Sequence, residues 1–243
     1  MQKRTTALAN VAMFSAYLFG AVSLSLLGLF LFFGPFNLVV LDASLPVALG
    51  LDATLCLLFF IQHSGMIRRS FQAWLGRFIA DHLHGAVFTV TSGVFILALL
   101  ILWQSTGPAL ISADGIVRLL LRGCFAAGIL GFVWGVRALG SFDAFGIRPI
   151  KAHLRGKKLR LQPLAIRGPY KWVRHPLYSF VLLILWCHPD LTPDRLVLNA
   201  TWTAWVFLGT VLEERDLVSV FGDPYREYQN TVPMLIPWRI PKS

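Results

Sequence analysis

Residues 85–103 read GAVFTVTSGVFILALLILW, a stretch of nineteen residues without a charged side chain. A helix of about 20 apolar residues spans the hydrocarbon core of a bilayer. Similar apolar windows occupy residues 11–33, 45–61 and 116–138, of which 45–61 is the shortest. We therefore expect an integral membrane protein whose residues 1–139 form four transmembrane helices.

The composition of the whole chain agrees with a membrane protein. Of its 243 residues, 56% are hydrophobic and 14% are charged, whereas an ordinary soluble domain carries about 25% charged residues. The cysteines are Cys56, Cys124 and Cys187, and no two of them form a C-x-x-C pair. We therefore expect neither a disulfide nor a metal site. No repeat or flexible linker interrupts the chain, so we expect a single membrane domain over residues 1–243.

The second part of the chain, residues 140–243, is more polar. A basic loop over 140–176 is followed by two apolar arms, 177–187 and 195–212, which we interpret as a helical hairpin. The first arm is short for a full crossing. Asp223-Pro224 is typical of a helix start and predicts a short amphipathic helix at the membrane surface. The expected fold is therefore all-α, with about five to six transmembrane helices, a cytoplasmic loop and this C-terminal helix.

Positive charge is distributed unevenly over the predicted loops. With a cytoplasmic N-terminus, 19 of the 22 Lys and Arg residues fall on one side, in the two tails and in residues 62–84 and 137–176. The opposite loops, 34–44 and 104–115, hold none. This is the positive-inside pattern, which predicts that both termini are cytoplasmic. The net charge of +10 then reflects topology and contact with membrane lipid headgroups, and no nucleic-acid partner is expected.

Polar residues gather at both ends of the predicted hairpin. Before its first arm, Gly168-Pro169-Tyr170 leads into Arg174-His175-Pro176-Leu177-Tyr178. Proline disfavours helix at the residue before it, so the helix should begin near Leu177 with first-turn amide groups free to bind an anion. Arg174 and His175 would strengthen such a site. Alternatively, Arg174 reaches lipid headgroups and His175 caps a helix.

Glu213-Glu214 follows the second arm, and Phe221-Gly222-Asp223-Pro224-Tyr225 and Tyr228 come next. Neighbouring residues on a helix point about 100° apart, so we expect only one of the two glutamates to face a site. The other reading is a solvated helix end paired with Arg215.

Two more polar stretches lie at the same predicted membrane level. Gln62-His63-Ser64 ends the second window, and Phe142-Asp143 with Gly146-Ile147-Arg148 follows the fourth. His63 is either a proton acceptor, since histidine titrates near neutrality, or an interfacial cap. Asp143 either receives a proton or orients Arg148, or these two residues form a structural ion pair.

The pattern GPY-x-x-VRHP-x-Y, EE-x-x-L and FG-x-x-Y-x-x-Y resembles the integral membrane methyltransferases related to isoprenylcysteine carboxyl methyltransferase. Residues 62–66, 142–148 and 212–217 make the bacterial methanethiol S-methyltransferases the closer resemblance. The resemblance implies a location in the bacterial inner membrane and S-adenosyl-L-methionine as the cofactor. It also implies which residues bind the cofactor: Gly168, Tyr170, His175, Pro176, Tyr178, Glu213 and Glu214.

The implied reaction is methylation of a small thiol, with methanethiol to dimethyl sulfide as the leading case. It requires neither a metal nor a covalent enzyme intermediate. We expect His63 or Asp143 to accept the thiol proton and Arg148 or Arg174 to stabilise the thiolate. The residues expected to contact the acceptor are Gln62, Ser64 and Tyr225. The alternatives are a carboxyl methyltransferase that acts on a lipidated cysteine and a non-catalytic, denitrification-linked membrane accessory protein.

Overall fold

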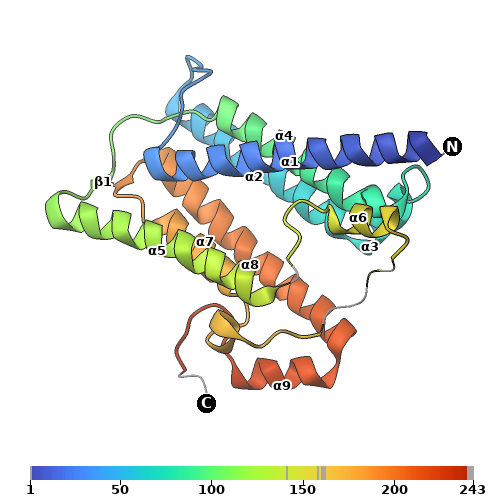
Figure 1. Ribbon diagram of the computed structural model, residues 1–243. Helices are drawn as coiled ribbons and strands as arrows, with labels where there is room; N and C mark the ends of the chain where they lie inside the picture. The colour runs from blue at the N-terminus through green and yellow to red at the C-terminus, as the bar shows by residue number, and fades with distance from the viewer. Residues whose placement is uncertain (1, 141, 158, 160–162, 240–243) are drawn as a thin grey trace. The chain divides into compact units, whose positions relative to one another are not determined.

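The computed structural model describes residues 2–140, 142–157, 159 and 163–239 (Figure 1). This part of the chain is mostly helical and contains two short antiparallel strands, β1 (Ile111–Ser112) and β2 (Asp190–Leu191). Two short 3-10 helices are η1 (Asp81–Leu83) and η2 (Gly168–Lys171). The α-helices are α1 (Gln2–Phe33), α2 (Leu45–Ile67), α3 (Arg69–Leu75), α4 (His84–Leu102), α5 (Gly115–Leu139), α6 (Arg148–Leu154), α7 (Pro176–Trp186), α8 (Pro193–Phe221) and α9 (Asp223–Thr231).

Five helical segments are long and apolar enough to cross a membrane: Thr6–Phe33, Leu45–Ile67, Asp81–Leu102, Gly115–Leu139 and Pro193–Phe221. The first four match the four predicted windows, and the all-α membrane fold is confirmed. The fifth, α8, is longer than the predicted arm 195–212. Apolar composition stops at Leu212, whereas the helix continues through the charged residues that follow. The 11-residue α7 is short, as expected for the first arm.

The chain divides into two compact units, each described by itself below. The first contains the described residues of Met1–Thr106 and Asp143–Leu161, and the second those of Gly107–Phe142 and Gln162–Ser243. The expectation of a single domain stays a prediction.

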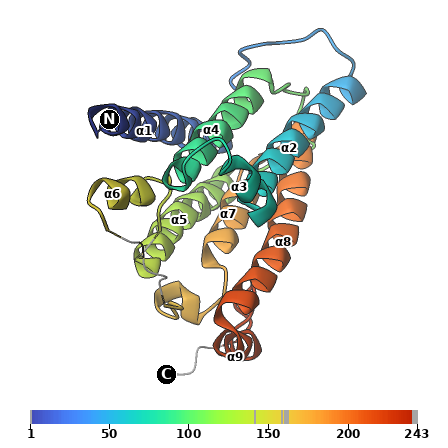
Figure 2. The ribbon, with the colours of Figure 1, turned by 90° about the vertical axis from the view of Figure 1, so that its right-hand side faces the viewer.

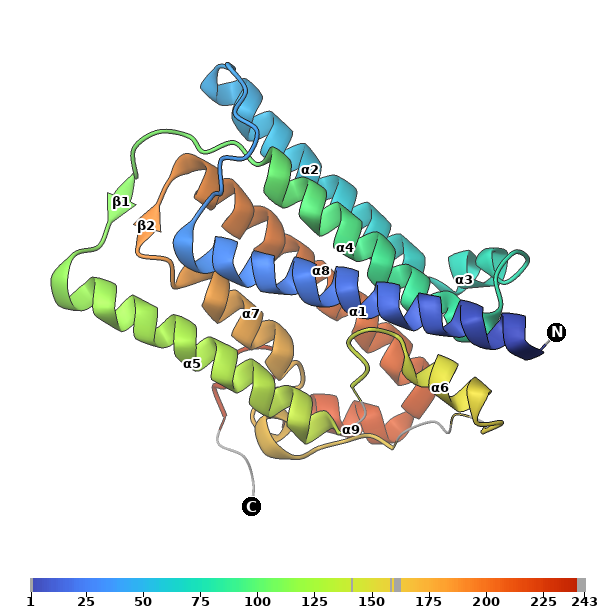
Figure 3. The same cartoon turned by 45° about the horizontal axis from the view of Figure 1, so that its top comes forward.

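In the first unit, α4 packs against both α1 and α2 (Figure 3). Gly93 allows the close approach to α1, because a Cβ there would lie 2.9 Å from the carbonyl oxygen of Phe19. The turn before α6 approaches α4 in the same way. A Cβ at Gly85 would lie 2.7 Å from the Cα of Gly146, whose φ of +64° also favours glycine. The segment that carries Asp143 is thus held against the start of α4.

In the second unit, α5 packs against α7, and α8 contacts both α7 and α9 (Figure 2). Glycines of α5 face α7: a Cβ at Gly128 would lie 2.8 Å from Ile184, and one at Gly135 would lie 2.7 Å from Leu177. Gly131 lies between them, against the Phe180 ring. Small residues at this spacing let two helix backbones approach closely.

Gly131→Ala should destabilise the second unit, because the added methyl group would overlap the Phe180 ring. Overpacking of this kind costs about 1–3 kcal/mol. Gly123→Ala on the same helix is the matched control, since a Cβ there meets nothing within 4 Å and alanine favours helix. Thermal unfolding in detergent should show a lower midpoint for Gly131→Ala than for Gly123→Ala. Equal midpoints would contradict tight packing at this point.

Candidate functional site

A cavity of about 460 Å³ lies in the second unit. Small-molecule sites typically measure about 300–1,000 Å³, so the volume suits a ligand of intermediate size. One side of the wall is apolar and comes from α5, α7, α8 and residues 163–165. The other end is polar and consists of Tyr170, Arg174, His175, Tyr178, Glu213, Tyr225 and Tyr228.

The residues just before α7 bind the C-terminal segment 233–235. The backbone amides of Arg174 and His175 donate to the carbonyl oxygens of residues 233 and 234, at 2.9 and 3.1 Å. Ser179 Oγ donates to the carbonyl oxygen of residue 235 at 2.6 Å. The helix begins directly after His175, as the proline at the next position predicts. The C-terminal segment is therefore part of the framework that positions the polar end of the cavity.

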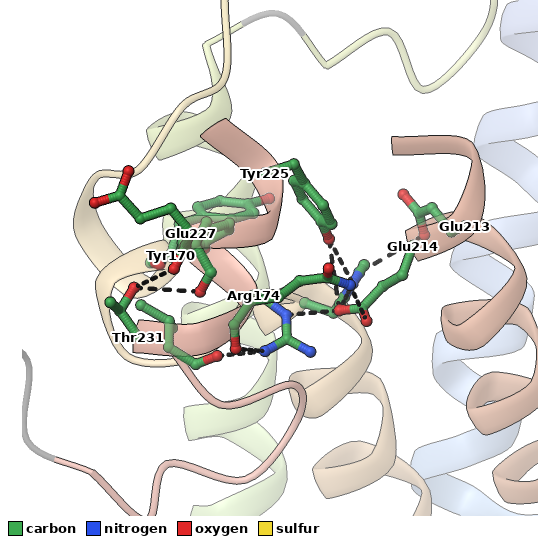
Figure 4. Close-up of polar contacts among 11 residues, drawn as sticks. Tyr170, Arg174, Glu213, Glu214, Tyr225, Glu227 and Thr231 are labelled. Atoms are coloured by element: carbon green, nitrogen blue, oxygen red, sulfur yellow. Dashed lines mark hydrogen bonds and ion pairs between the residues drawn. The ribbon is translucent and has the colours of Figure 1, made fainter. Parts of the chain in front are cut away.

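Arg174 lies at the centre of a buried hydrogen-bond network (Figure 4). Its Nε donates to Oε1 of Glu214 at 2.6 Å, and one terminal nitrogen donates to the carbonyl oxygens of Gln229, at 3.0 Å, and Val232. The Gln229 amide donates to the other Glu214 oxygen at 2.9 Å. The side chains of Arg174 and Glu214 are only 9% and 12% exposed. Arg174 thus joins the start of α7 to α8 and α9, and its expected action on a thiolate stays a prediction.

The two adjacent glutamates have different surroundings. Oε1 of Glu214 also accepts from Nε2 of His175 at 3.2 Å and from the Tyr225 hydroxyl at 3.5 Å, so both oxygens of this carboxylate are engaged. Glu213 lines the cavity, and its buried Oε2 has no hydrogen-bond partner among the described residues. This oxygen lies 3.7 Å from Nδ1 of His175. Glu213 is therefore the carboxylate available to a ligand.

His175 is buried and uncharged near neutral pH. Burial lowers the pKa of His175 from its ordinary value of 6.5, although Glu213 and Glu214 act in the opposite direction. Since Nε2 faces a carboxylate oxygen of Glu214, which only accepts, Nε2 carries the proton. The unprotonated Nδ1 then lies 3.7 Å from Oε2 of Glu213, and neither of these two atoms can donate a hydrogen bond to the other.

Aromatic side chains surround this acceptor pair. Burial raises the pKa of Tyr170 to about 12 and also raises the pKa values of Tyr225 and Tyr228, so these phenols stay neutral. The Tyr228 hydroxyl donates to the carbonyl oxygen of Tyr170 at 2.5 Å. The Tyr178 ring stacks on His175, with 5.7 Å between ring centroids. Neutral aromatic rings beside a carboxylate form a surface that attracts cations.

The residues expected to bind a cofactor fall into two groups. Five of the seven line the cavity: Tyr170, His175, Pro176, Tyr178 and Glu213. The other two support the wall. Glu214 holds Arg174, and Gly168, at φ +57°, sits where a Cβ would lie 3.0 Å from Ala138.

Gln229 and the segment 233–235 were not among the expected residues. Gln229 lies four positions after Tyr225 on α9, and this spacing places both on one helix face. That spacing could have indicated from the sequence that Gln229 lies near the site. The C-terminal segment binds through backbone atoms, for which the sequence offers no comparable pattern.

Three residues with expected roles lie near the end of α2 in the first unit: Gln62, His63 and Ser64. The His63 ring packs against Phe59 and Phe88, with centroid distances of 5.3 and 4.8 Å. Its Nδ1 lies 3.5 Å from Oγ of Ser92, which also accepts from the Gln62 amide at 3.2 Å. His63 is thus held between aromatic rings, and its role as a proton acceptor stays a prediction.

Asp143 binds backbone groups at the start of α6. Its Oδ1 accepts from the amide of Ile147 at 3.1 Å, and its Oδ2 accepts from the amide of Arg148 at 2.8 Å. Amides in a first helical turn have no partner within the helix, so this carboxylate stabilises α6. Asp143 therefore positions the backbone of Arg148, while proton transfer to Asp143 and thiolate stabilisation by Arg148 stay predictions.

Comparison with known proteins gives the family. No protein-family model and no solved structure matches the chain. Methanethiol S-methyltransferase 1 of Bradyrhizobium diazoefficiens is 32% identical over 202 residues, which cover 82% of this chain and 70% of that protein. The methanethiol S-methyltransferase of Pseudomonas deceptionensis is 34% identical over 204 residues, 80% of this chain and 75% of the relative. This chain belongs to the methanethiol S-methyltransferase family.

Membership of the methanethiol S-methyltransferase family confirms the resemblance seen in the motifs. Nurim of Rattus norvegicus is also similar, at 28% identity over 191 residues that cover 72% of this chain and 70% of nurim. The methanethiol S-methyltransferase matches extend over about four fifths of the chain, so the likeness is not confined to the C-terminal motifs.

Arg174→Ala should destabilise the protein strongly, because it leaves the Glu214 carboxylate buried without its cation. Removal of one partner from a buried pair costs about 3–5 kcal/mol. Arg226→Ala is the matched control, since its side chain is 65% exposed and lies 3.8 Å from Asp223. An exposed pair contributes at most about 1 kcal/mol. Unfolding in mixed detergent measures both variants, and equal losses would contradict the importance of the buried network.

Proposed function

We propose that this protein transfers a methyl group from S-adenosyl-L-methionine to methanethiol, which yields dimethyl sulfide, at the cytoplasmic face of the bacterial inner membrane. The names of the bacterial relatives support the acceptor and the reaction. The same names imply a methyl donor, and the cavity of the second unit supports S-adenosyl-L-methionine in particular.

The observation that carries this proposal is the unsatisfied oxygen of Glu213. A buried acceptor without a partner is costly, and here it lies 3.7 Å from Nδ1 of His175, in a cavity that several tyrosines also line. The arrangement suits a ligand with a positive charge and several hydrogen-bond donors. S-adenosyl-L-methionine has both, in its sulfonium, its amino group and its ribose hydroxyls. When bound, it supplies a methyl group on a positively charged sulfur.

The residues of the cavity have separable roles in this proposal. Glu213 accepts hydrogen bonds from the ligand, and Tyr170 and Tyr178 attract its positive charge. Neutral His175 adds no opposing charge. The apolar wall excludes water, which strengthens the attraction between a sulfonium and a thiolate and removes competing solvent. Transfer between two held sulfur atoms then depends mainly on alignment.

Glu213→Gln should weaken the binding of S-adenosylhomocysteine about tenfold or more, since hydrogen bonds to a charged group contribute about 1.5–3 kcal/mol. Glu227→Gln is the matched control, because Glu227 is an exposed carboxylate of α9. Isothermal titration calorimetry on the purified full chain measures both dissociation constants. An unchanged affinity in Glu213→Gln would remove this carboxylate from the proposed site.

The same preparation tests the reaction. With S-adenosyl-L-methionine and methanethiol, dimethyl sulfide should appear in the headspace by gas chromatography. If S-adenosylhomocysteine binds but no dimethyl sulfide forms, methanethiol is rejected, and methylation of a prenylated cysteine becomes the next assay. If S-adenosylhomocysteine does not bind at all, the accessory-protein alternative is favoured.

The proposed orientation rests on charge. The two tails and the loops on the same side of the membrane carry 19 of the 22 Lys and Arg residues, which favours both termini in the cytoplasm. Green fluorescent protein fused after residue 243 should therefore fluoresce, and alkaline phosphatase at the same position should be inactive. The reverse result would invert the topology.

A further inference from the structure

Cys124 of α5 and Cys187, which directly follows α7, have no role in the proposed methyl transfer. Both belong to the second unit, and both carry free thiols. We propose that these two thiols form a reversible intramolecular disulfide when the protein meets an oxidant that is itself a disulfide. This pairing is independent of methyl transfer. It departs from the expectation, drawn from cysteine spacing alone, that the chain forms no disulfide.

The contacts of two α5 glycines fix the register of α5 against α7. A Cβ at Gly128 would lie 2.8 Å from the Ile184 side chain, and a Cβ at Gly135 would lie 2.7 Å from the Leu177 side chain. Residue numbers therefore fall along α7 as they rise along α5, so the two helices run antiparallel.

The same register brings the two cysteines opposite each other. Cys124 precedes Gly128 by four residues, and Cys187 follows Ile184 by three. Residues three or four apart lie on the same face of a helix, so each cysteine lies about one turn from the contact between Gly128 and Ile184. The two thiols interact through a side-chain hydrogen bond, as this register requires.

The separation of the two backbones suits a disulfide. The Cα atoms of a disulfide lie about 4.4–6.8 Å apart, whereas the axes of packed helices usually lie about 8–10 Å apart. Small residues at a helix contact allow a closer approach. Gly128 supplies such a contact one turn from the cysteines, so the helices come close enough there for the link to form without a large shift.

The chain is also held together on the other side of the two thiols. Strands β1 and β2 pair Ser112, before α5, with Asp190, after α7 (Figure 3). A terminal nitrogen of Arg118, in the second turn of α5, lies 2.5 Å from Oδ1 of Asp190. The start of α5 is thus fixed to the turn that follows Cys187, and the cysteines lie between two fixed points.

The exposure of the two thiols gives the order of the reaction. Cys124 is exposed, whereas Cys187 is only 5% exposed. The Cys124 thiolate therefore attacks the oxidant first, which breaks the S–S bond of the oxidant and releases its first thiol. Sγ of Cys187 then attacks Sγ of Cys124 in the mixed disulfide and releases the second thiol. Two electrons pass to the oxidant, and the two protons from the cysteines end on the released thiols.

The proposed orientation places this pair near an oxidising compartment. With both termini in the cytoplasm, the start of α5 and the end of α7 face the opposite side, where loop 104–115 carries no Lys or Arg. Disulfides form and persist on the outer side of the bacterial inner membrane. The choice of compartment rests on that orientation, whereas the ability of the two thiols to pair does not.

The link is tested on the purified full chain with one molar equivalent of dithiodipyridine, a small disulfide. Trypsin digestion without reductant should give a linked pair of peptides, residues 123–137 and 175–195, which separates on reduction. In Cys187→Ser, Cys124 should instead keep a pyridyl adduct, since the second attack is lost. Wild-type protein that keeps such an adduct at Cys124, or that links two copies of the chain, would overturn the proposal.

A matched variant moves the thiol by one position. Cys124→Ser combined with Gly123→Cys keeps the depth of the thiol but turns it about 100° around the helix. A Cβ at Gly123 meets nothing within 4 Å, so this thiol points away from α7 and should not link to Cys187. Linking from position 123 as efficient as from position 124 would contradict the register on which the proposal depends.

Thermal unfolding provides a second readout that needs no turnover. A disulfide constrains the unfolded chain, so the oxidised protein should unfold about 5–15 °C above the reduced protein. Cys56→Ala, which changes the third cysteine, should show the same shift, and Cys124→Ala should show none. An oxidised wild-type protein with an unchanged or lower midpoint would mean that the link strains α5 against α7, which would contradict a pair already arranged for it.

Discussion

The guanidinium of Arg174 and the carboxylate of Glu214 form the buried ion pair on which the candidate site of the second unit depends. Two charges removed from water are stabilised only when their remaining hydrogen-bonding positions are filled. Gln229, His175 and backbone carbonyl oxygens at the end of α9 fill them here. The pair therefore fixes the start of α7, the C-terminal third of α8 and α9 relative to one another. It also engages Glu214 fully, which leaves its neighbour Glu213 as the carboxylate that faces the cavity.

The part of the fold that could be predicted from the sequence is the set of membrane-spanning helices, because the bilayer requires them to be apolar. A helix in a bilayer must be apolar along its length, so the four N-terminal windows appear directly in the composition, and the structure confirms them. The end of α8 could not be predicted in this way. Residues 213–216 are charged, and the partner that accommodates Glu214 within the helix is Arg174, which is distant in sequence. The partner of the α5 glycines likewise became known only from the packing against α7.

The sequence predicted which residues form the candidate site better than it predicted how their side chains are arranged. The motifs single out Tyr170, His175, Tyr178 and the glutamate pair. All of these except Glu214 line one cavity, and Glu214 contacts His175 in its wall. The 100° rotation between neighbours on a helix implies that one glutamate faces inward, but only the contacts of Arg174 decide which. The sequence predicts that Asp143 lies at the same membrane level as the other polar stretches. Its two hydrogen bonds to backbone amides could not be predicted, because they depend on a turn that no motif describes.

The backbone hydrogen bonds between residues 174–179 and the segment 233–235 have a consequence for biosynthesis. Residue 235 must leave the ribosome before these bonds can form, and every membrane-spanning helix, the last of which ends at Phe221, leaves it earlier. Chains generally fold from the N-terminus during synthesis. The first unit can thus acquire most of its helices early, whereas the polar end of the cavity in the second unit is completed only after insertion into the bilayer is finished. A nascent chain halted before that point would carry an open, incompletely walled pocket.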